Sequence, residues 1–170
     1  MSKKQRILAI DPGIRNIGFA VIEGTRLCHY GVKTISRSAS IRKTLRLGRE
    51  IIRDLITDFT PRILAVEQTY FPHDRNGSTL NRFAKEIERI GRENLLRVNC
   101  ISVNTVRKRV CGFGRAGKWD VAAMLSSKYP ELRPYRRSDR RWKERHHFNM
   151  FDAIALGLAV SNGRNSPTTQ

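Results

Sequence analysis

Two short apolar runs, at residues 7–10 and 63–66, constrain the fold of this chain more than any other feature. Each consists of four apolar residues in a row, without the apolar–polar alternation of a strand that has one wet face. Such runs are typical of strands that are buried on both faces, and a sheet of such strands needs helices on both sides. The sequence therefore predicts an α/β fold.

The rest of the chain supplies the other elements of such a fold. Residues 18–22 and 27–35 have strand character and follow residues 7–10 through short turns, so the first three strands are expected to be antiparallel. With a further strand at residues 100–103, the prediction is a mixed five-stranded sheet flanked by helices. Apolar residues recur at helical spacing in the segments 38–60, 80–95, 104–110, 119–128 and 148–160.

A length of 170 residues suits one domain, and we predict that residues 1–160 form it. Residues 129–145 are polar and basic, contain Pro130 and Pro134, and are expected to form a loop. Residues 161–170 are polar and are expected to form a disordered tail.

The charge balance points to a polyanionic partner. Thirty-three Lys and Arg residues against 15 Asp and Glu residues give a net charge of +18. Such a surface attracts nucleic acid first and an anionic membrane second. No apolar run approaches the roughly 20 residues of a membrane-spanning helix, and the basic residues 1–6 precede too short an apolar run for a secretory signal. Three cysteines without CxxC spacing fit a reducing cytoplasm.

Three of the scarce acidic residues lie inside or against apolar runs. Asp11 and Glu67 each follow a buried strand, and Asp152 lies within the apolar segment 148–160. Taken singly, Asp11 suits a turn, Glu67 an arginine partner and Asp152 a backbone hydrogen bond. Taken together, they are expected at one edge of the sheet, where three carboxylates would repel each other unless a divalent cation lay among them. Oxygen-only ligands suit Mg²⁺ or Mn²⁺.

At this point the sequence resembles a known family. Segments 7–13 and 18–21, 66–70, 106–118 and 152–156 resemble, in that order, the motifs of RuvC-type Holliday junction resolvases. The resemblance implies a ribonuclease H-like fold and a cytoplasmic, nucleoid-associated homodimer, with branch-migration proteins as further partners. It implies an endonuclease that resolves four-way DNA junctions by paired symmetric nicks, leaving 5′-phosphate and 3′-hydroxyl ends. Two metal ions would activate water and stabilise the leaving oxygen.

The resemblance also implies roles for single residues. Asp11 would bridge both metal ions, Glu67 and Asp152 would each complete one metal shell, and Lys118 would neutralise the scissile phosphate. Tyr70 matches an aromatic position that stacks on bases near the junction centre. With the interpretation of the basic loop given below, the expected DNA-binding residues are Tyr70, Arg107, Lys108, Arg115, Lys118, Arg136, Arg137, Arg140 and Arg141.

The chain departs from the family pattern at two places. The position three residues before Asp152 usually carries Asp or His and here carries Asn149, whose neutral oxygen would be a weak metal ligand. Alternatively, His146 or His147 would take that place through a shift of the helix start. The second departure is segment 81–87, which replaces a Gly-rich pattern in a helix that contributes to dimerisation in the family.

Two basic segments complete the nucleic-acid signal. Residues 112–118 match GxxxxGK, but Trp119 stands where a nucleotide-binding loop needs Ser or Thr, so no nucleotide cofactor is expected. The glycines and the helix that follows them would instead receive a DNA phosphate. The loop before residue 145 interleaves basic and aromatic side chains, as a flexible nucleic-acid strand requires, and its clustered arginines include Arg136, Arg137, Arg140 and Arg141.

Two other functions remain open from the sequence. One is another ribonuclease H-like nuclease that acts on structured RNA or DNA. The other is a junction-binding protein with weakened catalysis, which Asn149 suggests. Metal-dependent, symmetric cutting of a four-way junction separates all three.

Overall fold

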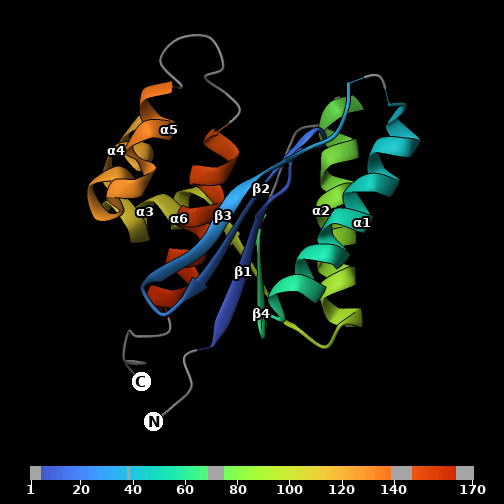
Figure 1. Cartoon of the computed structure of the whole chain (residues 1–170), viewed down its shortest axis with the longest axis horizontal. Helices are drawn as coiled ribbons and strands as arrows, with labels where there is room; N and C mark the ends of the chain where they lie inside the picture. The colour runs from blue at the N-terminus through green and yellow to red at the C-terminus, as the bar shows by residue number, and fades with distance from the viewer. Residues whose placement is uncertain (1–4, 38, 69–74, 139–146, 164–170) are drawn as a thin grey trace.

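The computed structural model describes residues 5–37, 39–68, 75–138 and 147–163, which form one mixed sheet with helices on both faces (Figure 1). The strands are β1 (Arg6–Asp11), β2 (Asn16–Glu23), β3 (Arg26–Thr34), β4 (Ile63–Gln68) and β5 (Arg97–Ser102). Their order across the sheet is β3-β2-β1-β4-β5. The predicted α/β fold and five-stranded mixed sheet are confirmed.

β1 occupies the centre of the sheet. It pairs with β2 in antiparallel fashion and with β4 in parallel, and β4 continues the parallel half by pairing with β5. In β1 and β4, residues 7–10 and 63–66 are buried throughout. This agrees with their uninterrupted apolar sequence, because central strands of a covered sheet have no wet face.

Two helices cover one face of the sheet and four cover the other (Figure 1). α1 (Ile41–Phe59) and α2 (Arg75–Glu93) pack on the face of Leu8 and Ile10. The face of Ile7 and Ala9 is covered by α3 (Val103–Cys111), α4 (Lys118–Lys128), α5 (Arg133–Ser138) and α6 (Phe148–Gly163), with the 3₁₀ turn η1 (Pro130–Leu132) beside them. Alternate side chains of each strand therefore feed two separate cores.

α6 approaches the sheet closely because glycine lies at the contacts. A Cβ atom on Gly18 in β2 would lie 1.9 Å from the backbone oxygen of Asn149, and one on Gly157 would lie 2.6 Å from Ile22. Gly18 is also the residue paired with Asp11 across the sheet. The missing side chain thus lets the first turn of α6 lie directly beside the end of β1.

The structure corrects the expected loop at residues 129–145. Residues 130–138 form η1 and α5, because Leu132 is completely buried and Tyr129 donates from its hydroxyl to the carbonyl of Thr25 at 2.6 Å. α6 also runs three residues past the predicted end at 160. There, Ser161 is buried and donates to the carbonyl of Gly24. Within the four described ranges, every helix is too short or too polar to cross a membrane.

Candidate active site

Three acidic side chains lie at the edge of the sheet where β1 and β4 end. The two strands are parallel and pair Ile10 with Val66, so the residues that follow, Asp11 and Glu67, lie side by side. Asp152 lies on α6, whose first turn rests on Gly18 beside Asp11. The fold thus brings together the three carboxylates that the sequence singled out.

Burial raises the pKa of all three carboxyl groups, and repulsion between carboxylates raises the pKa of Asp11 and Glu67 further. The pKa of Asp11 lies well above its usual range because the group is desolvated and faces the charges of Glu67 and Asp152. Desolvation and the charge of Asp152 raise the pKa of Glu67 to about 7. Burial also raises the pKa of Asp152. The three groups resist ionising together, so the site favours an additional positive charge.

Two basic side chains supply part of that charge. Lys118, the first residue of α4, places its Nζ 3.4 Å from Oδ2 of Asp152 and lowers the pKa of all three carboxyl groups. Arg107 in α3 lowers the pKa of Glu67 and Asp152. The Lys118 side chain is 52% exposed and that of Asp152 is 18% exposed, so the ammonium group reaches the carboxylates from the solvent side.

The donor set fits a divalent cation by its chemistry. Carboxylate oxygens are the ligands that Mg²⁺ and Mn²⁺ prefer, and a cation among them would relieve the repulsion that raises their pKa values. Among the residues that the structure describes, no three Asp, Glu, His or Cys side chains form a metal-binding cluster as they stand.

Asn149 has a structural partner at this site. Its amide nitrogen donates to the backbone carbonyl of Asn16, the first residue of β2, at the end of the turn that follows Asp11. A Cβ atom on Gly13 in the same turn would lie 2.8 Å from that nitrogen. Asn149 therefore fastens α6 to the turn after Asp11 through its nitrogen, and the weak ligand role predicted for its oxygen stays a prediction.

Comparison with known proteins places the chain in a family. The family model described as crossover junction endodeoxyribonuclease RuvC matches residues 7–130. The RuvC protein of Akkermansia muciniphila is 34% identical over 158 residues, covering 90% of this chain and 88% of that protein. The chain belongs to the RuvC family.

Two further relatives extend the similarity. The RuvC protein of Gluconacetobacter diazotrophicus is 33% identical over 95% of this chain and 92% of its own length. The unaligned part of this chain is too short to reach Asp152 from the C-terminus, so Asp152 lies within the aligned region. The solved structure of T. thermophilus RuvC in complex with a Holliday junction substrate has a TM-score of 0.72 at 22% identity, covering 95% of this chain and 96% of that chain. At this identity the likeness supports the ribonuclease H-like fold.

The structure places several of the predicted DNA-binding residues of this RuvC family member on one face. Lys108 and Arg115 are exposed in α3 and in the segment after it, and Arg107 and Lys118 lie beside the carboxylates. Arg136 is half-buried in α5, and Arg137 belongs to the same helix. Tyr70, Arg140 and Arg141 lie outside the described residues.

The alternative ligand His147 has an aromatic partner, and its ligand role stays a prediction. Its ring lies 5.1 Å from the ring of Tyr135, in an edge-on contact between the start of α6 and α5. Tyr135 in turn packs edge-on against Tyr30 of β3. His147 thus belongs to an aromatic contact, and His146 lies outside the described residues.

The start of α4, where the sequence predicts a phosphate contact, carries a helix cap from the chain itself. Asp120 accepts a hydrogen bond from the backbone N–H of Gly117 at 2.7 Å and so caps the helix with the chain's own carboxylate. This carboxylate takes one backbone N–H at the start of the helix, and the phosphate contact predicted there stays a prediction. The signal was present in the sequence, because an acidic residue three positions after the N-cap is half of a capping box.

Gly18 is a functional residue whose role the sequence did not reveal. It was part of a family motif, but its contact with the backbone of Asn149 depends on the tertiary fold. A glycine inside a strand signals the close approach of another backbone, and that was the available clue.

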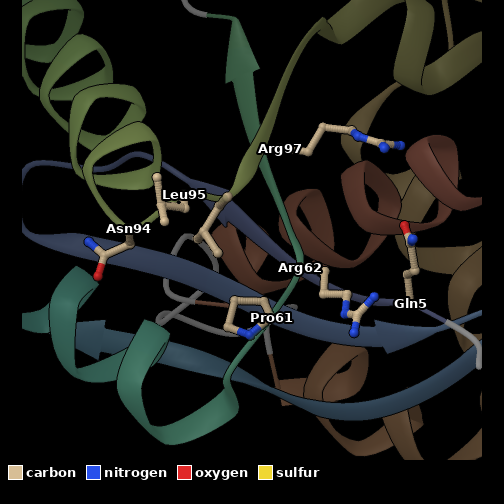
Figure 2. Close-up of a pocket in the computed structure, with 7 residues that line it drawn as sticks. Gln5, Pro61, Arg62, Asn94, Leu95 and Arg97 are labelled. Carbon is tan, nitrogen blue, oxygen red and sulfur yellow. The ribbon is translucent and has the colours of Figure 1, made fainter.

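A pocket lies at the opposite edge of the sheet (Figure 2). Gln5 and Arg62 precede β1 and β4, and Arg97 begins β5, so the pocket opens at the amino ends of the parallel strands. The carboxylates lie at the carboxyl ends. The pocket is therefore separate from the candidate active site.

Proposed function

We propose that this chain is a metal-dependent endodeoxyribonuclease that resolves four-way DNA junctions by paired symmetric nicks. The observation that carries the proposal is the meeting of Asp11, Glu67 and Asp152 beside Lys118 in a chain of the RuvC family. The relatives are named crossover junction endodeoxyribonucleases, and a family member has been solved with a Holliday junction substrate.

The cofactor is Mg²⁺ or Mn²⁺, with two ions per site. Asp11 would hold both ions, Glu67 and Asp152 would each hold one ion, and Asn149 would be a weak additional donor. When bound, such ions lower the pKa of water and stabilise charge on the leaving 3′-oxygen. The products are 5′-phosphate and 3′-hydroxyl ends.

The chain's own residues hold and orient the substrate. Lys118 neutralises the scissile phosphate, since its half-exposed ammonium group lies at the solvent side of Asp152. Arg107 acts beside it. Exposed basic residues such as Lys108 and Arg115 bind neighbouring phosphates, which fits the net charge of +18. Paired cuts on a two-fold junction require two such sites, so the working form is a homodimer. Its substrate is DNA, which places it in the cytoplasm at the nucleoid.

Cleavage of fixed four-way junctions, with Mg²⁺ and Mn²⁺ supplied separately, tests the function. Asp11→Asn should abolish cutting and preserve junction binding, because binding rests on the positive surface and chemistry rests on the carboxylate. Asp54→Asn, at an exposed position of α1, is the matched control and should cut like wild type.

Three outcomes would contradict the proposal. Loss of binding together with cutting would make Asp11 a structural turn residue. Binding without cutting by the wild type would favour a junction-binding protein. Preferential cutting of structured RNA would favour the other nuclease.

A further inference from the structure

Two large aromatic side chains are exposed at the two ends of segment 113–119, which contains Lys118. Among the described residues, four large apolar side chains are exposed: Phe113 (53%), Trp119 (42%), Ile41 (51%) and Leu95 (94%). Phe113 and Trp119 are six positions apart in the sequence, on either side of segment 114–118. Burying such a side chain stabilises a protein by roughly 1.5–3 kcal/mol. Because both rings are exposed, the folded chain lacks this stabilisation.

Trp119 is held against the active site by its neighbours. Its ring lies 5.0 Å from the ring of Phe148 in an edge-on contact. The Nζ of Lys118 lies 5.7 Å from the centre of the same Phe148 ring and 3.4 Å from Asp152. Phe148 and Asp152 are four residues apart on α6, on one face of the helix. Trp119 is therefore fixed on one side and open to solvent on the other, next to the lysine that is proposed to meet the scissile phosphate.

Phe113 is displayed on a turn that points it outward. Gly112 ends α3 with a left-handed backbone (φ 86°), a conformation that only glycine adopts easily. A Cβ atom on Gly114 would lie 3.3 Å from the backbone oxygen of Asn104, so the turn folds back on the start of α3. The flanking residues Lys108 and Arg115 are exposed and basic. Phe113 thus stands on a positively charged surface.

We propose that Phe113 and Trp119 stack on nucleobases beside the scissile phosphate and so govern which sequence is cut. The inference rests on the proposed function and adds to it. Lysine and arginine side chains bind phosphates and do not distinguish bases, whereas an aromatic ring stacks on a base with about 1–3 kcal/mol. Successive phosphates of one strand are about 3.4 Å apart along the helix axis. Trp119, adjacent in the chain to Lys118, therefore reaches the nucleotide next to the cut.

The surrounding charge favours DNA as the occupant of this surface. A protein partner that covered Trp119 would lie against Lys118 and the Phe148 ring beside Asp152 and would crowd the active site. A nucleic-acid strand places its phosphates on the basic side chains and its bases on the rings at the same time. Unstacked bases at a junction centre are free to make such contacts.

The test uses single-turnover cleavage of a set of four-way junctions that differ in the nucleotides at the cut. The variants are Phe113→Ala, Trp119→Ala and the conservative Trp119→Phe. Leu95→Ala is the matched control, because Leu95 is still more exposed and lines the pocket at the opposite edge of the sheet. A 2-aminopurine base beside the scissile phosphate reports stacking by its fluorescence in EDTA, where no cutting occurs.

We expect each Ala variant to cut the preferred junction 5- to 150-fold more slowly, which corresponds to the stacking energy of one base. The rates on different sequences should converge, the 2-aminopurine response should be lost, and the salt dependence of junction binding should stay as in wild type because the phosphate contacts remain. Trp119→Phe should retain the sequence preference and the response, because a phenyl ring still stacks on a base. Leu95→Ala should behave as wild type.

The proposal is overturned if the Ala variants keep the wild-type order of sequences and the wild-type 2-aminopurine response. It is also overturned if Leu95→Ala slows cutting as much as they do. Failure of the wild type to cut any four-way junction overturns the proposed function instead, and the fluorescence response then still decides whether the two rings stack on bases.

Discussion

Desolvation is the largest cause of the raised pKa of Asp11, Glu67 and Asp152. These carboxyl groups therefore hold protons in the folded, metal-free chain at pH values where the unfolded chain has released them. For Glu67 this window runs from the ordinary pKa of 4.5 to about 7. Inside it the folded state binds more protons, so the free energy of unfolding falls as pH rises.

Thermal unfolding in EDTA checks this pH dependence. The contribution of Glu67 to stability should be fully present below its ordinary pKa and should be lost as pH rises through about 7. Each pKa unit of difference corresponds to about 1.4 kcal/mol. Glu67→Gln has no such proton to lose, so its Tm relative to wild type should increase from pH 5 to pH 8. A constant Tm difference across that range would contradict the raised pKa.

Asn149 carries the second prediction at this scale. Asn149→Asp replaces the nitrogen that donates to the carbonyl of Asn16 by an oxygen, which leaves two acceptors facing each other. The free energy of unfolding should drop by about 0.5–1.5 kcal/mol, the typical contribution of one hydrogen bond, because Asn149 is half-buried. An unchanged midpoint in denaturant would contradict this. The same variant tests the ligand role, since a carboxylate ligand would lower the Mg²⁺ concentration for half-maximal cutting.

The candidate site was predictable where chemistry is written in the local sequence. Asp11 and Glu67 end apolar strands, and Asp152 interrupts an apolar helix, so burial and convergence follow from pattern alone. The capping role of Asp120 and the contact between Asn149 and Asn16 were not predicted. The first signal was overlooked, and the second joins residues 133 positions apart, which no local pattern reveals.

Among the elements, the strands were easier to predict than the segment between α4 and α6. Uninterrupted apolar runs identify β1 and β4 because a covered sheet buries both faces of a strand. The sequence of η1 and α5 predicts a loop because it is rich in proline and arginine. These two elements are held in place by Leu132, a buried side chain in a polar segment, and by the hydrogen bond from the Tyr129 hydroxyl to the carbonyl of Thr25.

The placement of α6 leads to a prediction at the scale of elements. Gly18→Ala would set a Cβ atom 1.9 Å from the carbonyl oxygen of Asn149, a contact between backbones that no side-chain movement relieves. The first turn of α6 must shift, and Asp152 must move away from Asp11. We expect at least a 10-fold loss of cutting and a lower Tm. Gly31→Ala on β3 is the control, because its nearest neighbour is the flexible ring of Phe19 at 3.1 Å. Equal activity of both variants would contradict this positioning role.

At the scale of the whole molecule, the two faces of the sheet carry different tasks. α1 and α2 cover one face, while α3 to α6 cover the other together with Asp152 and Lys118 (Figure 1). Basic residues occur on both sides, so a net charge of +18 alone does not locate the DNA. Some positive charges contact phosphates, and others only add to the overall attraction of the protein for DNA.

Junction binding should weaken steeply with salt, because each neutralised phosphate contributes about −0.9 to the slope of log K against log salt. Neutralising Arg136, Arg137, Arg140 and Arg141 with Gln should make the slope less steep by up to about four such contributions if all four contact phosphates. The control neutralises four exposed residues of α1, on the other face: Arg42, Lys43, Arg46 and Arg53. Both variants lower the net charge equally, so a loss of general attraction affects them alike. If the four arginines contact phosphates directly, their variant has a flatter slope and the α1 variant keeps the wild-type slope. Equal slopes in the two variants would show that these four arginines lie outside the DNA interface.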